Sequence, residues 1–231
     1  MRTTYPSNLS DAEWETLQRH LPPLPKRGRP PIHPLRAIFD AIFYVLRHHG
    51  CGIRVKTVEE SAGISGFGAH KHIKDRKRHL LVDTLGIPIS IYVTPADVHD
   101  TKGARCLLAG LAFFVPQLKK IWADAAYRGQ ELAEWCQITG SWELEVVERT
   151  PGTRGWSRVP RRWAVERTIS WISRNRRLSK DYERKVQTSE TLIQVAMIRL
   201  LLARLGRQPR ASPHTQGKSG LIVHDQGNDP I

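Results

Sequence analysis

The alternation of short apolar strands with helices through the middle and end of the chain constrains the fold most. Residues 78–84 and 89–94 are predicted to be two strands joined by a turn at 85–88. Helix and strand patterns then alternate before two C-terminal helices. The expected elements are a helix from 100 or 101 to 114, a strand at 119–123, a helix at 130–139, a strand at 142–147, and helices at 160–176 and 188–205. This order predicts an α/β fold with a mixed sheet and helices on both faces.

The first fifty residues have a different, helical pattern. Ser10 and Glu13 form a capping box, which predicts the start of a short helix. A proline-rich basic linker at 26–31 separates this helix from an amphipathic helix whose apolar residues lie between 38 and 46. The predicted parts are a small helical N-terminal domain at 5–50, an α/β domain at 55–205, and a disordered tail at 206–231 with little to bury.

The amino-acid composition indicates which class of binding partner and which compartment to expect. The chain of 231 residues has 36 Lys and Arg against 22 Asp and Glu, a formal charge of +14, which predicts a polyanionic partner. The three cysteines have no paired spacing, which indicates a reducing compartment. The most apolar stretch, at 192–205, is interrupted by Arg199 and Arg204 and is too short to cross a bilayer. Because the N-terminus also lacks an apolar signal, we expect a cytoplasmic protein without a membrane partner.

A strongly cationic helix near the C-terminus holds one acid, Glu166, within the segment RRWAVERT at 161–168. Arg162 lies one helical turn before it, so a surface ion pair is the simpler interpretation. That interpretation does not account for the cations that follow. Guanidinium groups donate in a planar fork that suits phosphate oxygens, while a carboxylate can hold a divalent metal. The arginines predicted to bind DNA here are Arg162, Arg167, Arg174, Arg176 and Arg177.

A second acid, Asp124, directly follows the apolar strand at 121–123. Carboxylates at strand ends in α/β sheets often face a ligand crevice. The alternative is an ordinary turn former or helix cap. Arg128 and Gly129, close downstream, add a cation and a flexible position beside the acid.

Other basic segments are weaker candidates for DNA contact. Arg27 and Arg29 lie in the linker sequence KRGRP at 26–30, which resembles a minor-groove hook, although a solvated linker is the alternative. Lys77 and Arg78 lie near the end of a basic run at 70–79 that is a candidate for phosphate contact. No Cys or acid spacing completes a zinc site with the histidines of that run. The tryptophans expected in the core are Trp122, Trp142 and Trp163, whereas Trp171 suits either core or surface.

Several of these segments together resemble bacterial insertion-sequence transposases of the DDE class, of the short IS-five type with an IS-four-like transposase domain. The resemblance covers residues 5–205. The segments that carry it are KRHLLVDTLG at 77–86, PADVHD at 95–100, IWADAAYRG at 121–129, residues 160–178, DYER at 181–184, and, in the N-terminal domain, YPSNLSD at 5–11 and residues 35–47.

This resemblance implies an RNase H-like core at 55–205 and metal-dependent phosphoryl transfer on DNA. Asp124 matches the second acid and Glu166 the third of three that share two Mg²⁺ or Mn²⁺ ions. Arg162 matches the arginine of the family's tyrosine–arginine–glutamate–lysine signature, but Val159 and Ser173 stand at its tyrosine and lysine positions. The implied partners are the terminal repeats of the element, target DNA and a second copy of the chain.

The first acid departs from the family pattern. The family reads aspartate-serine-glutamine-serine before valine-lysine-threonine, whereas CGIR at 51–54 precedes Val55 here. An internal deletion that removed the first catalytic aspartate and its strand explains this junction, and Asp83 is the nearest substitute. We therefore expect a transposase whose strand cleavage and transfer are defective. The alternative is a non-catalytic DNA-binding remnant or regulator.

Overall fold

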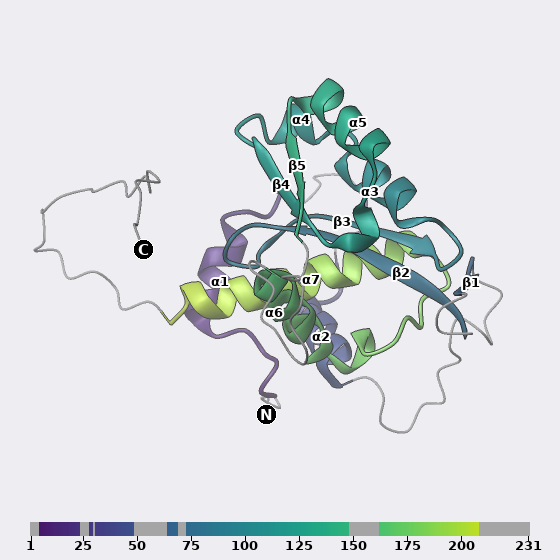
Figure 1. Ribbon diagram of the computed structural model, residues 1–231. Coiled ribbons are helices and arrows are strands. Elements are labelled where there is room, and N and C mark those ends of the chain that lie inside the picture. The colour runs from purple at the N-terminus through teal and green to yellow at the C-terminus, as the bar shows by residue number, and fades with distance from the viewer. Residues whose placement is uncertain are drawn as a thin grey trace, which may run out of the picture.

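The computed structural model describes residues 5–23, 28–29, 31–48, 64–68, 73–147 and 162–207, apart from the side chains of 68, 73–75 and 162 (Figure 1). The predicted tail beyond 207, the Cys51–Val55 junction and Arg27 lie outside these residues. The elements are α1 (Asp11–Gln18), α2 (Leu35–His48), β1 (Gly66–Gly68), β2 (Ile73–Val82), β3 (Pro88–Pro95), α3 (Asp100–Leu108), α4 (Leu111–Phe114), β4 (Lys120–Ala123), η1 (Ala125–Tyr127), α5 (Gln130–Gly140), β5 (Glu143–Val146), α6 (Arg162–Ser173), η2 (Arg176–Leu178) and α7 (Val186–Leu205).

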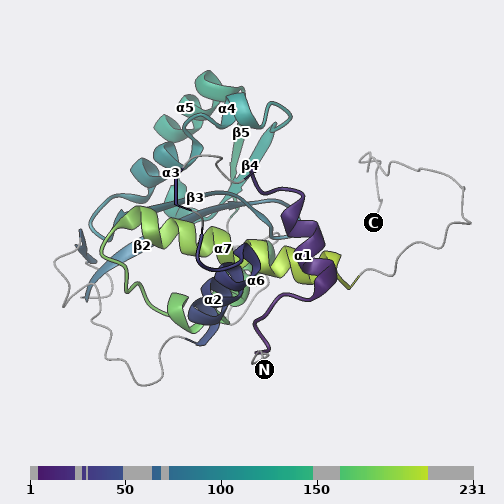
Figure 2. The ribbon, with the colours of Figure 1, turned by 180° about the vertical axis from the view of Figure 1, so that it is seen from behind.

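The mixed α/β architecture predicted from the sequence is confirmed. Strands β1, β2 and β3 form an antiparallel sheet, and β4 pairs in parallel with β5 through the crossover helix α5. Figures 1 and 2 place α3 on one side of the β2–β3 hairpin and α7 on the other. Within the described ranges the strands divide between two sheets that are not hydrogen-bonded to each other, rather than the single sheet that the strand order predicts.

The turn between β2 and β3 explains why the hairpin begins and ends where it does. Asp83 Oδ1 accepts hydrogen bonds from the amides of Leu85 (2.9 Å) and Ile87 (2.7 Å), which ends β2 two residues before the predicted boundary. Gly86 adopts a φ of 79°, a conformation that favours glycine. The start of β2 lies earlier than predicted because its first residues pair with β1, a short strand that the sequence pattern does not reveal.

The helix predicted from 100 to 114 is divided. Gly110, with a φ of 79°, separates α3 from α4, so the chain changes direction after Ala109. The predicted cationic helix is also shorter than expected, since α6 ends at Ser173 and η2 follows as a separate turn. These helix divisions bring apolar faces onto the neighbouring strands.

One core cluster fills the space between the β4–β5 sheet and helices α3, α4 and α5. Trp142 is 1% exposed there, which confirms its predicted place in the core. Trp122 and Trp163 were expected in the core as well, but they are 36% and 41% exposed. Trp122 lies on the solvent face of β4, where its Nε1 donates to Glu145 at 3.0 Å. The strand alternation places Ile121, not Trp122, in the core.

The N-terminal helices pack against the last helix. Leu46 of α2 is buried against Ile193 and Met197 of α7, while Leu17 of α1 lies in a second cluster with Leu202. The predicted capping box is confirmed, because Ser10 Oγ accepts from the Glu13 amide and the Glu13 carboxylate accepts from the Ser10 amide. A 2.8 Å ion pair between Glu13 and Arg199 joins α1 to α7. Helices α1 and α2 therefore pack directly on α7.

Leu46→Ala should destabilise the protein by about 2–5 kcal/mol, because it removes a buried side chain and leaves a cavity between α2 and α7. Val45→Ala on the same helix is the matched control, since Val45 is 40% exposed and should cost less than about 1 kcal/mol. Urea unfolding followed by circular dichroism measures both. Equal losses in the two variants would mean that α2 does not pack on α7 as described.

Candidate nucleic-acid interface and metal site

Asp124 lies at the end of β4, where it caps the short helix η1. Its Oδ1 accepts a hydrogen bond from the Ala126 amide at 3.0 Å, and its backbone carbonyl accepts from the Tyr127 amide at 3.1 Å. The carboxylate is exposed. Asp124 therefore combines both sequence interpretations, because it is a strand-end acid and also a cap. The cap uses one oxygen atom and holds the carboxylate in a fixed position.

Tyr127 attaches the Asp124 turn to β2. Its hydroxyl lies 3.1 Å from His79 Nδ1, and His79 Nε2 lies 2.9 Å from Thr94 Oγ1. The His79 ring is buried, and α3 crosses it closely at Gly103, where any Cβ atom would collide with the imidazole. The ring thus joins β2, β3, α3 and η1 at one point.

Burial sets the protonation of both rings in this contact. It raises the pKa of Tyr127 to about 12, with further contributions from the carboxylates of Asp100 and Asp124. It lowers the pKa of His79 below the ordinary value of 6.5; Lys77 adds to this effect and Asp100 opposes it. At neutral pH the Asp124 turn is therefore held by a hydrogen bond between two uncharged groups.

Glu166 is positioned by the packing of α6 on the β2–β3 turn. The buried hydroxyl of Thr168 donates to the Gly86 carbonyl at 2.5 Å. A Cβ at Gly86 would lie 2.9 Å from the Ala164 carbonyl, so a glycine is needed for this close approach. Ala164 and Thr168 face the hairpin, and Glu166, midway between them on the helix, is exposed. Both candidate carboxylates are therefore supported by the same hairpin, Asp124 through His79 and Glu166 through Gly86.

The exposed face of α6 carries a row of stacked rings and cations. The Arg167 guanidinium lies 4.1 Å from the ring centroid of Trp163 and 5.7 Å from that of Trp171. Arg204 of α7 lies 4.3 Å from the Trp171 centroid. Stacking holds each guanidinium by its plane and leaves its N–H edge able to donate. Trp171, for which the sequence suits either core or surface, is half-buried and in contact with two cations.

The remaining predicted DNA-binding residues fall into three groups. Arg29, Arg174 and Arg176 are exposed. Lys77 and Arg78 bind within the chain: Lys77 Nζ contacts Asp100 at 3.0 Å, and Arg78 donates to the carbonyls of Leu178 and Lys180. Arg177 belongs to this second group, because its guanidinium pairs with Glu183. The third group, Arg27 and the side chain of Arg162, lies outside the described residues.

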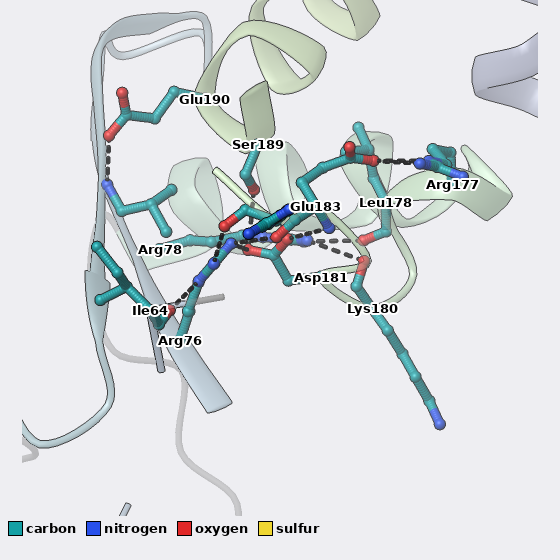
Figure 3. Close-up of polar contacts among 12 residues, drawn as sticks. Ile64, Arg76, Arg78, Arg177, Leu178, Lys180, Asp181, Glu183, Ser189 and Glu190 are labelled. Atoms are coloured by element: carbon teal, nitrogen blue, oxygen red, sulfur yellow. Dashed lines mark hydrogen bonds and ion pairs between the residues drawn. The ribbon is translucent and has the colours of Figure 1, made fainter. Parts of the chain in front are cut away.

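A buried ion pair that sequence reasoning missed lies below this surface (Figure 3). Arg76 of β2 pairs with Asp181 at 3.4 Å, and both side chains are almost fully excluded from solvent. Arg76 also donates to the carbonyls of Ile64, Glu183 and Arg184 at 2.6, 2.7 and 2.9 Å. The expected phosphate contact along 70–79 is therefore wrong for Arg76 and His79, which are buried. In the sequence this pair is indicated only by the presence of an acid in the segment DYER at 181–184 and of an arginine in the basic run at 70–79.

No metal cluster forms in the part of the chain that the structure describes. Neither Asp124 nor Glu166 belongs to a group of three or more His, Cys, Asp or Glu side chains that could hold an ion. Asp83, considered as a substitute for the first acid, uses its Oδ1 for two turn amides. In the same described residues no helix is long and apolar enough to span a membrane.

Two models of transposase families match the chain. The family model for the transposase DDE domain matches residues 34–201, which is more than half of the chain, and a model for transposases of the IS4/5 family matches residues 9–54. The chain belongs to the DDE transposases of the IS4/IS5 type. No curated protein and no solved structure matches it significantly. Membership implies an RNase H-like fold, a DNA partner and, in general, use of a divalent metal.

The pH dependence of folding should report on His79. Because its pKa is lowered on folding, the unfolded chain binds the proton more readily, so the stability that it contributes is complete above pH 6.5 and declines as the pH falls below that value. His79→Gln should flatten stability between roughly pH 5 and 7. Urea midpoints across this range measure the effect. An unchanged slope in the variant would remove His79 as the source.

Arg76→Met should cost about 3–5 kcal/mol, because it leaves the buried Asp181 carboxylate without its cation. Arg78→Met, which loses two bonds to carbonyls at a half-buried position, should cost about 1–2 kcal/mol. Replacing both Arg76 and Asp181 by apolar residues should recover part of the loss. Thermal unfolding of the three variants provides the test, and a loss for Arg76→Met no larger than that for Arg78→Met would contradict it.

Proposed function

We propose that this transposase binds insertion-sequence DNA through the exposed face of α6 and the turn that follows it. The observation that carries the proposal is the stacked Arg167, held between Trp163 and Trp171 on a solvent-facing helix. Arg174 and Arg176 extend the same cationic region beyond the helix. Charge-assisted bonds to phosphate oxygens are strong, and ordering the guanidinium in advance lowers the entropy lost on binding.

Asp124 and Glu166 are the proposed ligands of a divalent cation, Mg²⁺ or Mn²⁺. Both carboxylates are exposed and each is attached to the β2–β3 hairpin, which favours fixed positions. Oxygen ligands suit these ions, and Mg²⁺ takes one or two carboxylates together with phosphate oxygens. When bound, such an ion would stabilise charge that develops on a phosphate.

We propose further that this copy is defective in strand cleavage and transfer. By resemblance, two ions need three acids, and the first acid is replaced by the sequence CGIR at 51–54. A deletion that removed the first strand also accounts for two separate sheets among the described strands, because in an RNase H-like sheet that strand lies at the centre. The remaining activity would then be DNA binding, as in a transposase remnant or a regulator that occupies the element ends.

A dimer is part of this proposal, because transposition requires two DNA ends to be brought together. Holding two ends needs two DNA-binding surfaces, and one chain supplies one α6. Sedimentation of the protein with and without a duplex of the element end tests this directly. A single chain on each duplex at every concentration would remove the dimer from the proposal.

The wild-type protein should bind duplex DNA with strong salt dependence and should not nick it in Mg²⁺ or Mn²⁺. Arg167→Gln should weaken binding by about tenfold, since one ordered phosphate contact is lost. Arg19→Gln, at the exposed C-cap of α1, is the matched control and should change little. Fluorescence anisotropy of a labelled duplex measures binding, and relaxation of a supercoiled plasmid measures nicking.

The two acids provide the decisive comparison for the chemistry. Metal-dependent nicking by the wild type that disappears in Asp124→Asn and Glu166→Gln would overturn the proposed defect and place both acids in a working site. Nicking that survives both changes would remove them from the site altogether. Failure of the wild type to bind DNA even at low salt would overturn the binding proposal itself.

A further inference from the structure

The segment at 174–185, between α6 and α7, is held from inside by two arginines of β2 (Figure 3). Arg78 donates to the carbonyls of Leu178 (2.8 Å) and Lys180 (3.2 Å), and Arg76 donates to those of Glu183 and Arg184. Four backbone carbonyls of this segment are therefore turned toward the protein interior. We call residues 174–185 the basic turn.

The acids of the basic turn are also turned inward and neutralised. Asp181 pairs with Arg76, accepts from Ser189 Oγ at 3.0 Å and accepts from the Glu183 amide at 3.1 Å. Glu183 pairs with Arg177 at 2.6 Å, and both of these side chains are less than 20% exposed. Because Asp181 and Glu183 are paired with Arg76 and Arg177, their negative charges do not neutralise the cations on the outer side of the basic turn.

The outer side of the basic turn is consequently cationic. The exposed cations are Arg174, Arg176, Lys180, Arg184 and Lys185. Figure 3 shows the Lys180 side chain extending away from the internal network. Arg184 and Lys180 each give their carbonyl to an interior arginine, so the backbone that carries their side chains is fixed from below.

We propose that Lys180, Arg184 and Lys185 form a phosphate-binding surface for duplex DNA, continuous with Arg174 at the end of α6, and that Arg76 and Arg78 act as positioning residues beneath it. The inference rests on the proposed DNA-binding function and assigns a second, distinct stretch of the chain to it. A backbone already held by four hydrogen bonds from β2 loses little entropy when its side chains contact a row of phosphates. Contacts of this kind set position and affinity without reading sequence.

The test compares two triple variants that lose the same charge. Lys180→Gln, Arg184→Gln and Lys185→Gln remove the proposed surface. The control triple Arg19→Gln, Lys102→Gln and Lys119→Gln removes three exposed cations, which lie directly after α1, within α3 and directly before β4. Binding of a labelled mixed-sequence duplex is measured by anisotropy from about 50 to 200 mM salt. Circular dichroism and thermal midpoints verify that all three proteins are folded.

The basic-turn triple should bind at least about tenfold more weakly than the wild type, and its plot of log affinity against log salt should be shallower by about two to three units. The control triple should stay within about threefold of the wild type. If both triples bind alike while Arg167→Gln still weakens binding, the basic turn is not a DNA surface and the proposed function stands. If the wild type does not bind the duplex, both proposals fall together.

Discussion

The buried ion pair between Arg76 and Asp181 joins the β2–β3 hairpin to the segment that leads into α7. A guanidinium and a carboxylate that are both removed from water remain stable only when every donor and acceptor is paired, and Arg76 meets that condition with three carbonyls besides Asp181. Asp181, Glu183 and Arg184 lie more than a hundred residues along the chain from Arg76, whereas Ile64 lies 12 residues before it. The pair therefore fixes how the C-terminal helices lie on the hairpin.

The β2–β3 hairpin is a common support for three segments of the proposed function. His79 holds the turn of Asp124, Gly86 receives α6 with Glu166, and Arg78 receives the basic turn. The proposed function requires these acids and DNA contacts to be held in fixed positions, and all three segments contact the same hairpin. The contacts that hold these three segments to the hairpin are made by His79, Gly86 and Arg78.

The sequence was sufficient for the periodic elements and for the family. Capping residues, apolar spacing and the strand before Asp124 depend on near neighbours. The start of α1 and the bounds of β4, α5 and α7 therefore lie close to those predicted. The roles of Arg76, Arg78 and His79 could not be predicted, because whether a basic side chain is buried depends on a partner that only the fold brings near. Trp122 was misplaced for a related reason, since one position along a strand exchanges the two faces of the sheet.

Gly103 shows how a small residue can govern a distant group. Its missing side chain lets α3 rest on the His79 imidazole, and that ring in turn bonds to Tyr127 beside Asp124. A methyl group added at this crossing would push either the helix or the imidazole aside. A shift of the His79 ring would also shift Tyr127 and the turn at the end of β4. The position of the exposed Asp124 carboxylate therefore depends on the absence of a side chain at Gly103.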